Sequence, residues 1–170
     1  MSEAQPIFQV LPIAAREWQR YREIRLRALT EAPEAFGSSW ANESARPDSV
    51  WRERSISTPD RQMWSARRGE GWIGLVGAVR EPDFQLQLVS MWVDPGWRRQ
   101  GVARALIAAV VAWHRLGGSS RLVLWVSSDN PAARLCYESE GFRLTGARLA
   151  LPPDPTRERL EMLFAEPDWG

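Results

Sequence analysis

One connection in the chain decides the fold, and it reads Val93-Asp94-Pro95-Gly96-Trp97-Arg98-Arg99-Gln100-Gly101-Val102-Ala103. Before it, residues 86–93 are rich in apolar and β-compatible side chains, which predicts a strand. After it, apolar residues recur at three- and four-residue steps, which predicts a helix over 102–116. Pro95 cannot donate to a β-ladder and Gly96 allows a sharp turn, so the strand ends here.

Two arginines stand at the start of this predicted helix, where the positive end of the helix dipole lies. A cation there costs roughly 0.3–1 kcal/mol at an exposed site. An anion bound to the free N–H groups of the first turn would remove the conflict, and Arg98 and Arg99 would add charge to the site. Gly101 and Ala103 carry little Cβ bulk, so a phosphate can approach the main chain. The alternative interpretation is a solvated arginine pair in a loop.

Two motifs resemble those of a known family. Arg98-x-x-Gly101-x-Ala103, after a strand that ends Val93-x-Pro95, resembles the acetyl-CoA loop of the GCN5-related N-acetyltransferases (GNAT), whose pattern is Gln/Arg-x-x-Gly-x-Gly/Ala. Asn130-x-x-Ala133-x-x-x-Tyr137-x-x-x-Gly141-Phe142 is similar to the family's second signature, and a predicted strand separates the two motifs. Because both motifs occur in order, the chain is identified as a small bacterial single-domain member of this superfamily.

The pattern of the whole chain agrees with this resemblance. Periodicity and turn residues predict strands over 6–11, 62–67, 72–79, 86–93, 121–126, 142–149 and 159–165. Helices are predicted over 14–29, 48–56 (with Asp48 or Ser49 as N-cap), 102–116 and 131–140, and a rigid loop over 152–155. The resemblance implies an α/β (α+β) GNAT fold, in which a mixed central sheet of about seven strands is flanked by about four helices.

Composition narrows the classes of function. A chain of 170 residues with 44% hydrophobic and 25% charged residues fits one soluble domain over 1–170. The net charge of +1 gives no bulk attraction to nucleic acid or to an anionic membrane. No apolar run reaches the length of a membrane span and no signal peptide is recognised, so a cytoplasmic location is the default expectation.

Three scarce residue types exclude further chemistry. All 22 basic side chains are arginine, which excludes Schiff-base catalysis and the P-loop lysine. The single histidine, His114, falls in an apolar helix, so a catalytic triad or a histidine-based metal site is not expected. The single cysteine, Cys136, excludes an internal disulfide and is expected to be a core residue.

The resemblance implies an enzyme that transfers the acetyl group of acetyl-CoA to an amine. It assigns the pyrophosphate to a backbone-rich loop made of Arg98, Arg99, Gln100, Gly101, Val102 and Ala103. It also implies that the main chains of Met91 and Val93 pair with the pantetheine arm, and that Asn130 forms a hydrogen bond near the pantetheine or the acceptor. Arg134 would reach the 3′-phosphate of CoA, or would be a solvated residue of its helix.

Tyr137 is the residue to which the resemblance assigns catalysis. An amine that attacks a thioester releases a thiolate, and a phenol with an ordinary pKa of about 10 can protonate it without being ionised at neutral pH. The alternative is a buried structural tyrosine. The strand before the loop has Gln87 about where some members carry a glutamate base, so a water chain, Glu34, Glu81 or Asp83 remains open as the base.

The acceptor is expected to be a small-molecule primary amine bound beside residues 30–44 and 151–156, with Trp40, Trp92 and Trp125 as candidate wall residues. A protein or peptide N-acetyltransferase is the alternative, and a non-catalytic acyl-CoA sensor is the alternative from another class. Neither a metal nor nucleic acid is expected to bind. The resemblance also leads us to expect a homodimer.

Overall fold

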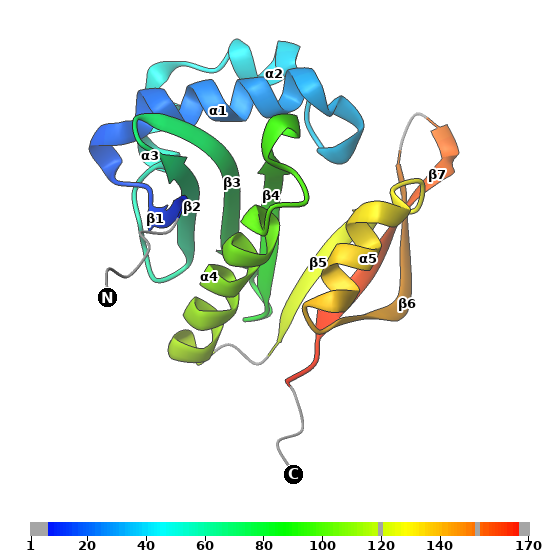
Figure 1. Cartoon of the computed structure of the whole chain (residues 1–170). Helices are drawn as coiled ribbons and strands as arrows, with labels where there is room; N and C mark the ends of the chain where they lie inside the picture. Colours follow the sequence, from blue (N-terminus) through cyan, green and yellow to red (C-terminus); the bar gives the residue numbers. More distant parts are fainter. Residues whose placement is uncertain (1–6, 119–120, 152–153, 167–170) are drawn as a thin grey trace.

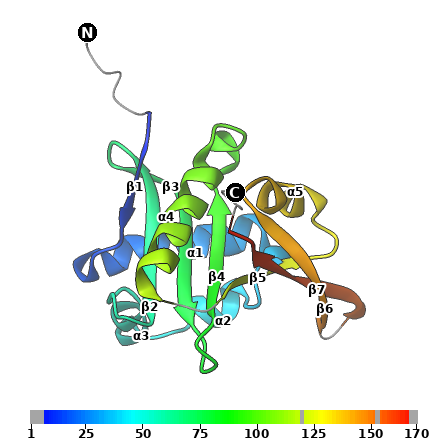
Figure 2. The same ribbon diagram turned by 90° about the horizontal axis from the view of Figure 1, so that it is seen from below.

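A seven-stranded mixed sheet forms the centre of the protein, and helices cover both of its faces (Figure 1, Figure 2). The computed structural model describes residues 7–118, 121–151 and 154–166. The strands are β1 (Gln9–Pro12), β2 (Arg61–Arg68), β3 (Gly71–Arg80), β4 (Leu86–Val93), β5 (Leu122–Ser127), β6 (Phe142–Leu151) and β7 (Asp154–Phe164). The helices are α1 (Trp18–Glu31), α2 (Trp40–Ser44), α3 (Asp48–Arg54), α4 (Val102–Gly117) and α5 (Pro131–Ser139), with 3-10 turns η1 (Ala15–Glu17), η2 (Pro33–Ala35) and η3 (Pro95–Trp97).

The strand order is β1-β2-β3-β4-β5-β7-β6. All neighbours are antiparallel except β4 and β5, which are parallel because α4 returns the chain to the same edge. The predicted mixed sheet of about seven strands is therefore confirmed. In Figure 1, β4 and β5 are closest at their first residues and then diverge, which divides the molecule into two halves.

Two apolar clusters hold the helices on the sheet. On one face, α4 packs through Leu106, Ile107 and Val110 against β3 and β4. On the other face, α1 packs with Trp51 of α3. Gly74 of β3 allows α4 to approach closely, because a Cβ at that position would lie 3.0 Å from Leu106 Cδ1 and 3.1 Å from Val102 Cγ1. This close packing fixes the start of α4 against the sheet.

The N-terminal half differs from the prediction at several points, since β1 covers Gln9–Pro12 rather than 6–11 and α1 begins at Trp18 rather than at residue 14. The segment expected to be an interruption between helices contains η2 and the additional short helix α2, in which Ser39 Oγ accepts a hydrogen bond from Asn42 N–H at 3.1 Å. The prediction of Asp48 or Ser49 as N-cap was wrong. Pro47 has the extended N-cap conformation with ψ 157°, so the helix starts one residue earlier, without a side-chain cap.

The C-terminal half contains a further correction. The proline-rich segment 152–155 was expected to be a loop, but β7 already begins at Asp154, while residues 152–153 lie outside the described ranges. Pairing along β6 lengthens β7 beyond the predicted start at Arg159, since Ala150 pairs with Glu158 and Leu151 with Asp154. Tertiary pairing therefore overrides the local turn signal of the prolines. No helix in the described ranges is long and apolar enough to span a membrane.

Candidate active site

The site is centred where β4 and β5 separate. Their ladder contains only two pairs, Leu86↔Leu122 and Gln87↔Val123, and beyond them the facing edges of the two strands are no longer paired with each other. Strand edges without a partner can bind an extended ligand through the main chain. Met91 lies on this free stretch of β4, as the proposed pairing with a pantetheine arm requires.

A β-bulge changes the course of β4 at the same point. Between the pairs Gly77↔Val89 and Leu75↔Trp92, β4 contains one residue more than β3. Ser90 takes up this extra residue with φ 59°, and its Oγ accepts a hydrogen bond from Arg25 at 3.1 Å. Arg25 is itself held by Glu43, whose Oε1 lies 2.8 Å from the arginine. A buried ion pair thus supports the irregular backbone beside Met91.

The start of α4 has the backbone geometry that the predicted anion site requires, while anion binding itself stays a prediction. Gly101 is the N-cap with φ 84°, and no atom lies within 4 Å of the position that a Cβ would take. In the described chain, the first backbone hydrogen bond here runs from Ala105 N–H to Gly101 O at 3.1 Å. The N–H groups of Val102, Ala103 and Arg104 are consequently free to bind an anion.

The side chains of the loop are less available than the sequence suggests. Arg98 donates to Val93 O at 3.0 Å and to Glu31 Oε2 at 2.6 Å, so its charge is compensated within the protein. Gln100 Nε2 donates to Gly96 O at 3.1 Å and tightens the turn. Arg99 is exposed and has φ 62°. The backbone, with Arg99, is therefore the main uncommitted part of the loop.

Two cavities meet between the halves of the molecule. The first, here called the sheet cavity, lies between β4, β5, α5 and residues 35–37 and has a volume of about 250 Å³. The second, the loop cavity, extends from α5 to Arg98 and the start of α4 and has a volume of about 330 Å³. The residues that line both cavities are Ala35, Met91, Asn130, Ala133 and Tyr137. A ligand that enters from the α4 loop therefore meets the sheet cavity at Tyr137.

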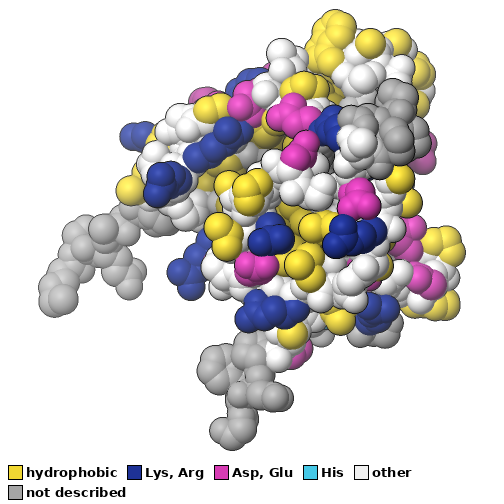
Figure 3. All heavy atoms as spheres, turned by 90° about the vertical axis from the view of Figure 1, so that its right-hand side faces the viewer, with side chains coloured by type: hydrophobic (Ala, Val, Ile, Leu, Met, Phe, Trp, Pro, Cys, Tyr) yellow, Lys and Arg dark blue, Asp and Glu magenta, His cyan; other side chains and the backbone are white. Residues whose placement is uncertain are grey.

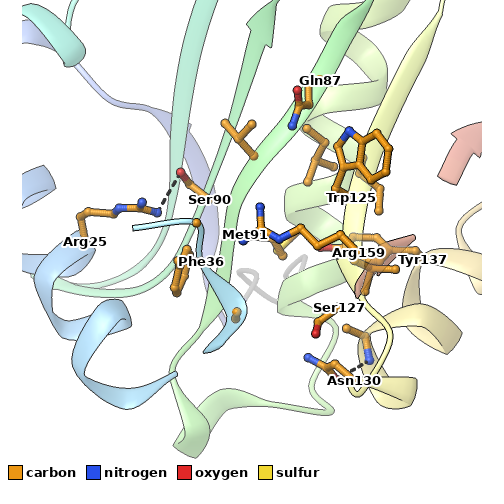
Figure 4. A pocket seen from close by; sticks show the side chains of 17 residues that line it. Arg25, Phe36, Gln87, Ser90, Met91, Trp125, Ser127, Asn130, Tyr137 and Arg159 are labelled. Carbon is orange, nitrogen blue, oxygen red and sulfur yellow. Dashed lines mark hydrogen bonds between the residues drawn. The ribbon is translucent and has the colours of Figure 1, made fainter. Parts of the chain in front are cut away.

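Tyr137 projects from α5 into this junction (Figure 4). Its ring is 9% exposed and packs edge-on against Phe142, with centroids 5.9 Å apart. Burial raises the pKa of Tyr137 well above its ordinary value, so the phenol stays protonated at neutral pH. Its hydroxyl forms no hydrogen bond with any residue of the described ranges, so its proton is available to a ligand.

Three neighbours on or before α5 have separate roles. Asn130 caps the helix, since its Oδ1 accepts from Ala133 N–H at 3.1 Å, and its amide nitrogen remains for a ligand. Arg134 lies 3.5 Å from Glu138 Oε1, and its predicted contact with a phosphate stays a prediction. Cys136, expected in the core, packs against it but also lines the loop cavity, where burial raises the pKa of its thiol.

The comparisons with known proteins agree with this geometry. The model of the acetyltransferase (GNAT) family matches residues 18–142. The chain belongs to the GNAT acetyltransferase family. It is 32% identical to the N-alpha-acetyltransferase RimI of Mycobacterium tuberculosis over 98 residues, which are 56% of this chain and 60% of that protein.

Solved GNAT structures share the fold. An acetyltransferase of the GNAT family from Streptococcus pneumoniae superposes with a TM-score of 0.77 at 14% identity, covering 92% of this chain and 99% of that one. A Bacillus anthracis protein assigned as a streptothricin acetyltransferase, solved with acetyl coenzyme A, superposes with a TM-score of 0.58 at 22% identity over 64% and 65% of the chains. The chain spans 33% to 60% of the length of the curated relatives it matches.

Few side chains near the sheet cavity could act as the general base that deprotonates the acceptor amine in this GNAT protein. Gln87 lines the cavity, where some members carry a glutamate, and no carboxylate stands among its described lining residues. Glu34 lines the loop cavity instead, whereas Glu81 and Asp83 line neither cavity. The described residues hold no group of three or more histidine, cysteine or acidic side chains that could bind a metal ion.

The three tryptophans expected in the acceptor wall lie in three different surroundings. Trp125 lines the sheet cavity, and its place in an acceptor wall stays a prediction. Trp92 lines the loop cavity and donates its indole N–H to Glu31 Oε2 at 2.8 Å. Burial raises the pKa of Glu31, but the hydrogen bonds from Trp92 and Arg98 outweigh it and lower the pKa below its ordinary value. Trp40 is 51% exposed and lines neither cavity, so the structure gives its prediction as a wall residue no support.

The sequence analysis assigned no role to several residues that line the sheet cavity, among them Arg25, Ser90 and Arg159. Phe36, which also lines it, lies in the segment 30–44 that was expected beside the acceptor. Arg25 lies over the Phe36 ring, 4.6 Å from its centroid, and forms one wall with Ser90. No local motif marks these residues, because they are distant in sequence and meet only in the folded chain. The segment 30–44 was expected beside the acceptor, and its residues 35–37 do line the sheet cavity.

Proposed function

We propose that the protein is an N-acetyltransferase that transfers the acetyl group of acetyl-CoA to the primary amine of a small-molecule acceptor within a ternary complex. The observation that carries this proposal is the junction of the two cavities at Tyr137. Acetyl-CoA would extend from the free N–H groups of α4 along Met91 and Val93, with its thioester at the junction. The acceptor would occupy the sheet cavity.

The chemistry needs few groups beyond positioning. The amine nitrogen attacks the thioester carbonyl carbon, the C–S bond breaks, and the Tyr137 hydroxyl gives its proton to the leaving sulfur. The amine releases a proton to water, since the sheet cavity has no carboxylate among its described lining residues. Binding both reactants in contact can lower the barrier by up to about 7–11 kcal/mol. Because burial raises its pKa, the phenol is still protonated when the sulfur leaves, and it regains a proton from water after the transfer.

A peptide acceptor is the second candidate, and the likeness to an N-alpha-acetyltransferase favours it. We rank it below a small molecule because the sheet cavity, of about 250 Å³, is small and partly enclosed by residues 35–37. The outer face around α5, β6 and β7 mixes side chains of both signs (Figure 3), including the pairs Arg134–Glu138 and Arg148–Glu158. The described residues of this face therefore do not form the one-sign acidic surface that would favour a basic peptide.

The first test is a thermal-shift scan with acetyl-CoA, CoA, NAD and ATP. A ligand at 100 times its Kd stabilises the fold by about 2.7 kcal/mol, which raises the Tm of a domain of this size by several degrees. We expect a shift with acetyl-CoA and CoA alone, followed by release of free thiol when amines are added. A shift without turnover on amines or peptides would indicate an acyl-CoA sensor, and no shift would refute the acetyl-CoA site.

A further inference from the structure

We infer that Arg159 binds a carboxylate of the acceptor, so that the preferred acceptor carries a carboxylate in addition to its amine. This inference rests on the proposed acetyl transfer, because it names the acceptor class for the same cavity. Arg159 would be a specificity-determining residue that positions the acceptor. Free amino acids and related amino-carboxylates are the acceptor class with this chemistry.

Arg159 reaches the sheet cavity from the strand next to β5. In β7 it pairs with Ser127 of β5 on one side and Leu149 of β6 on the other. Figure 4 shows its side chain extending across the cavity toward Met91. Its guanidinium lies against Gly37, where a Cβ would come within 3.2 Å of Nη1 and 3.3 Å of Nη2. The absence of a side chain at Gly37 therefore makes room for this cation.

The charge of Arg159 is not compensated inside the described protein. It forms no ion pair or hydrogen bond with any described residue. The neighbouring arginines differ, because Arg25 is paired with Glu43 at 2.8 Å and Arg157 with Asp129 at 3.4 Å. Burial, together with repulsion from Arg157, lowers the pKa of Arg159, yet a guanidinium remains charged at neutral pH.

A carboxylate is the ligand group that best fits this arrangement. A guanidinium presents parallel N–H donors that bind a carboxylate in bidentate geometry, and partial burial strengthens the pair. The described lining residues of the cavity carry no acidic group, so a polycationic acceptor would meet like charge without compensation. The phosphates of CoA are a poor alternative, because Arg159 lies outside the loop cavity that leads to α4.

The size of the cavity sets the distance between the two groups of the acceptor. Tyr137, where the amine must react, and Arg159 line the same cavity of about 250 Å³. One small molecule can therefore place its amine at the junction and its carboxylate at Arg159. Trp125 in the same wall offers apolar surface for the body of the acceptor.

The test compares matched acceptors by thiol release. Leucine and phenylalanine are each compared with two compounds that lack the carboxylate, the amino acid amide and the decarboxylated amine. The amine pKa of the amide lies below that of the amino acid and the amine pKa of the decarboxylated compound lies above it, so a difference in amine pKa cannot explain a preference over both. We expect wild-type kcat/KM to favour the carboxylates by roughly 10- to 100-fold, the size of one charge-assisted pair. Arg159→Met should remove this preference mainly through KM, and Arg159→Lys should retain part of it.

Arg157→Met is the matched control, because it removes one positive charge from the same strand and its side chain does not line the sheet cavity. It should leave the preference unchanged, and the melting curves of all variants should remain cooperative. Equal kcat/KM for an amino acid and its decarboxylated amine in the wild type would overturn the inference. Equal loss for both acceptors in Arg159→Met would also overturn it.

A binding measurement separates this inference from the proposed reaction. Calorimetry titrates leucine and phenylalanine into the CoA complexes of wild type and Arg159→Met. Binding that requires Arg159, without acetylation of any acceptor, would refute acetyl transfer and retain the carboxylate site. Acetylation of plain amines that does not depend on Arg159 would retain the reaction and refute the carboxylate site. No binding of either amino acid and no acetylation of either would refute the carboxylate site as well.

Discussion

Replacing Tyr137 by phenylalanine removes one hydroxyl and leaves the packed ring in place. Because that hydroxyl has no hydrogen-bond partner in the described chain, we expect the free energy of unfolding to change by less than about 1 kcal/mol. The ring contact with Phe142, at 5.9 Å between centroids, should be retained. Any large change in rate then reflects the lost proton donor.

We expect kcat to fall at least about tenfold, which is about 1.4 kcal/mol of barrier, because the thiolate must leave without an acid. The Kd for acetyl-CoA should stay within about twofold, since binding relies on the α4 loop and β4 rather than on the phenol. Burial raises the pKa of Tyr137, so its ionisation should not lower the wild-type rate below about pH 10.

The assay is thiol release at saturating acetyl-CoA, combined with calorimetry and melting curves. The matched control is Tyr21→Phe, because Tyr21 is also buried and packs edge-on against an aromatic ring, Trp51, but lines neither the sheet cavity nor the loop cavity. A Tyr137→Phe enzyme with wild-type kcat would leave the hydroxyl without a catalytic role. An equal rate loss in Tyr21→Phe would show that packing alone accounts for the effect.

Two further substitutions test the parts around the site. Gly101→Val should weaken acetyl-CoA binding at least about tenfold, because the new side chain adds bulk where the anion approaches a residue whose φ is 84°. The control is Gly69→Val, since Gly69 also has a positive φ of 54° but lies away from the loop. It should destabilise the fold by a comparable amount in melting curves and leave binding by calorimetry normal. Glu43→Gln should lower stability by about 3 kcal/mol at neutral pH, because it leaves Arg25 buried without a counter-ion. Burial raises the pKa of Glu43, but hydrogen bonding and charge from Arg25 outweigh burial and lower this pKa below its ordinary value. The stability that the pair contributes is therefore present above the unfolded-state pKa of about 4.3 and is lost as the pH falls through the lower folded-state pKa. Urea titrations should show this loss of stability in acid for the wild type and not for the variant.

The sequence predicted best those features that local physics determines. The strand 86–93 has the predicted bounds, and α4 begins at Val102 as predicted, because periodicity, Pro95 and Gly101 act within a few residues. The length of β7 was not predictable, since pairing with β6 extends it through Pro155. Wrong boundaries therefore occur where a partner strand, rather than the local sequence, decides the conformation.

The same distinction applies to the site. In the proposed site, residues of the α4 loop would act mainly through backbone N–H groups, whose positions follow from glycine, a turn and a helix start, so a short motif can indicate them. Arg98 shows the limit of that inference, since the motif does not reveal that Glu31 already binds its guanidinium. The partner of an arginine is a tertiary fact, and for Arg98 it comes from the end of α1.

The division of the sheet explains why the cosubstrate could be inferred before the acceptor. The half that ends at β4 supplies the α4 loop, while the half that begins at β5 supplies Tyr137 and Arg159 (Figure 1). The two halves pair through only two residue pairs, so their relative placement is set by packing and not by a continuous ladder. Gly37, between η2 and α2, contacts Arg159 on β7 and thus brings the N-terminal half against the last strand. If the acceptor binds at Arg159 as proposed, its choice depends on side chains from distant segments, and substitutions at Gly37 or Arg159 should change the acceptor without changing the affinity for acetyl-CoA.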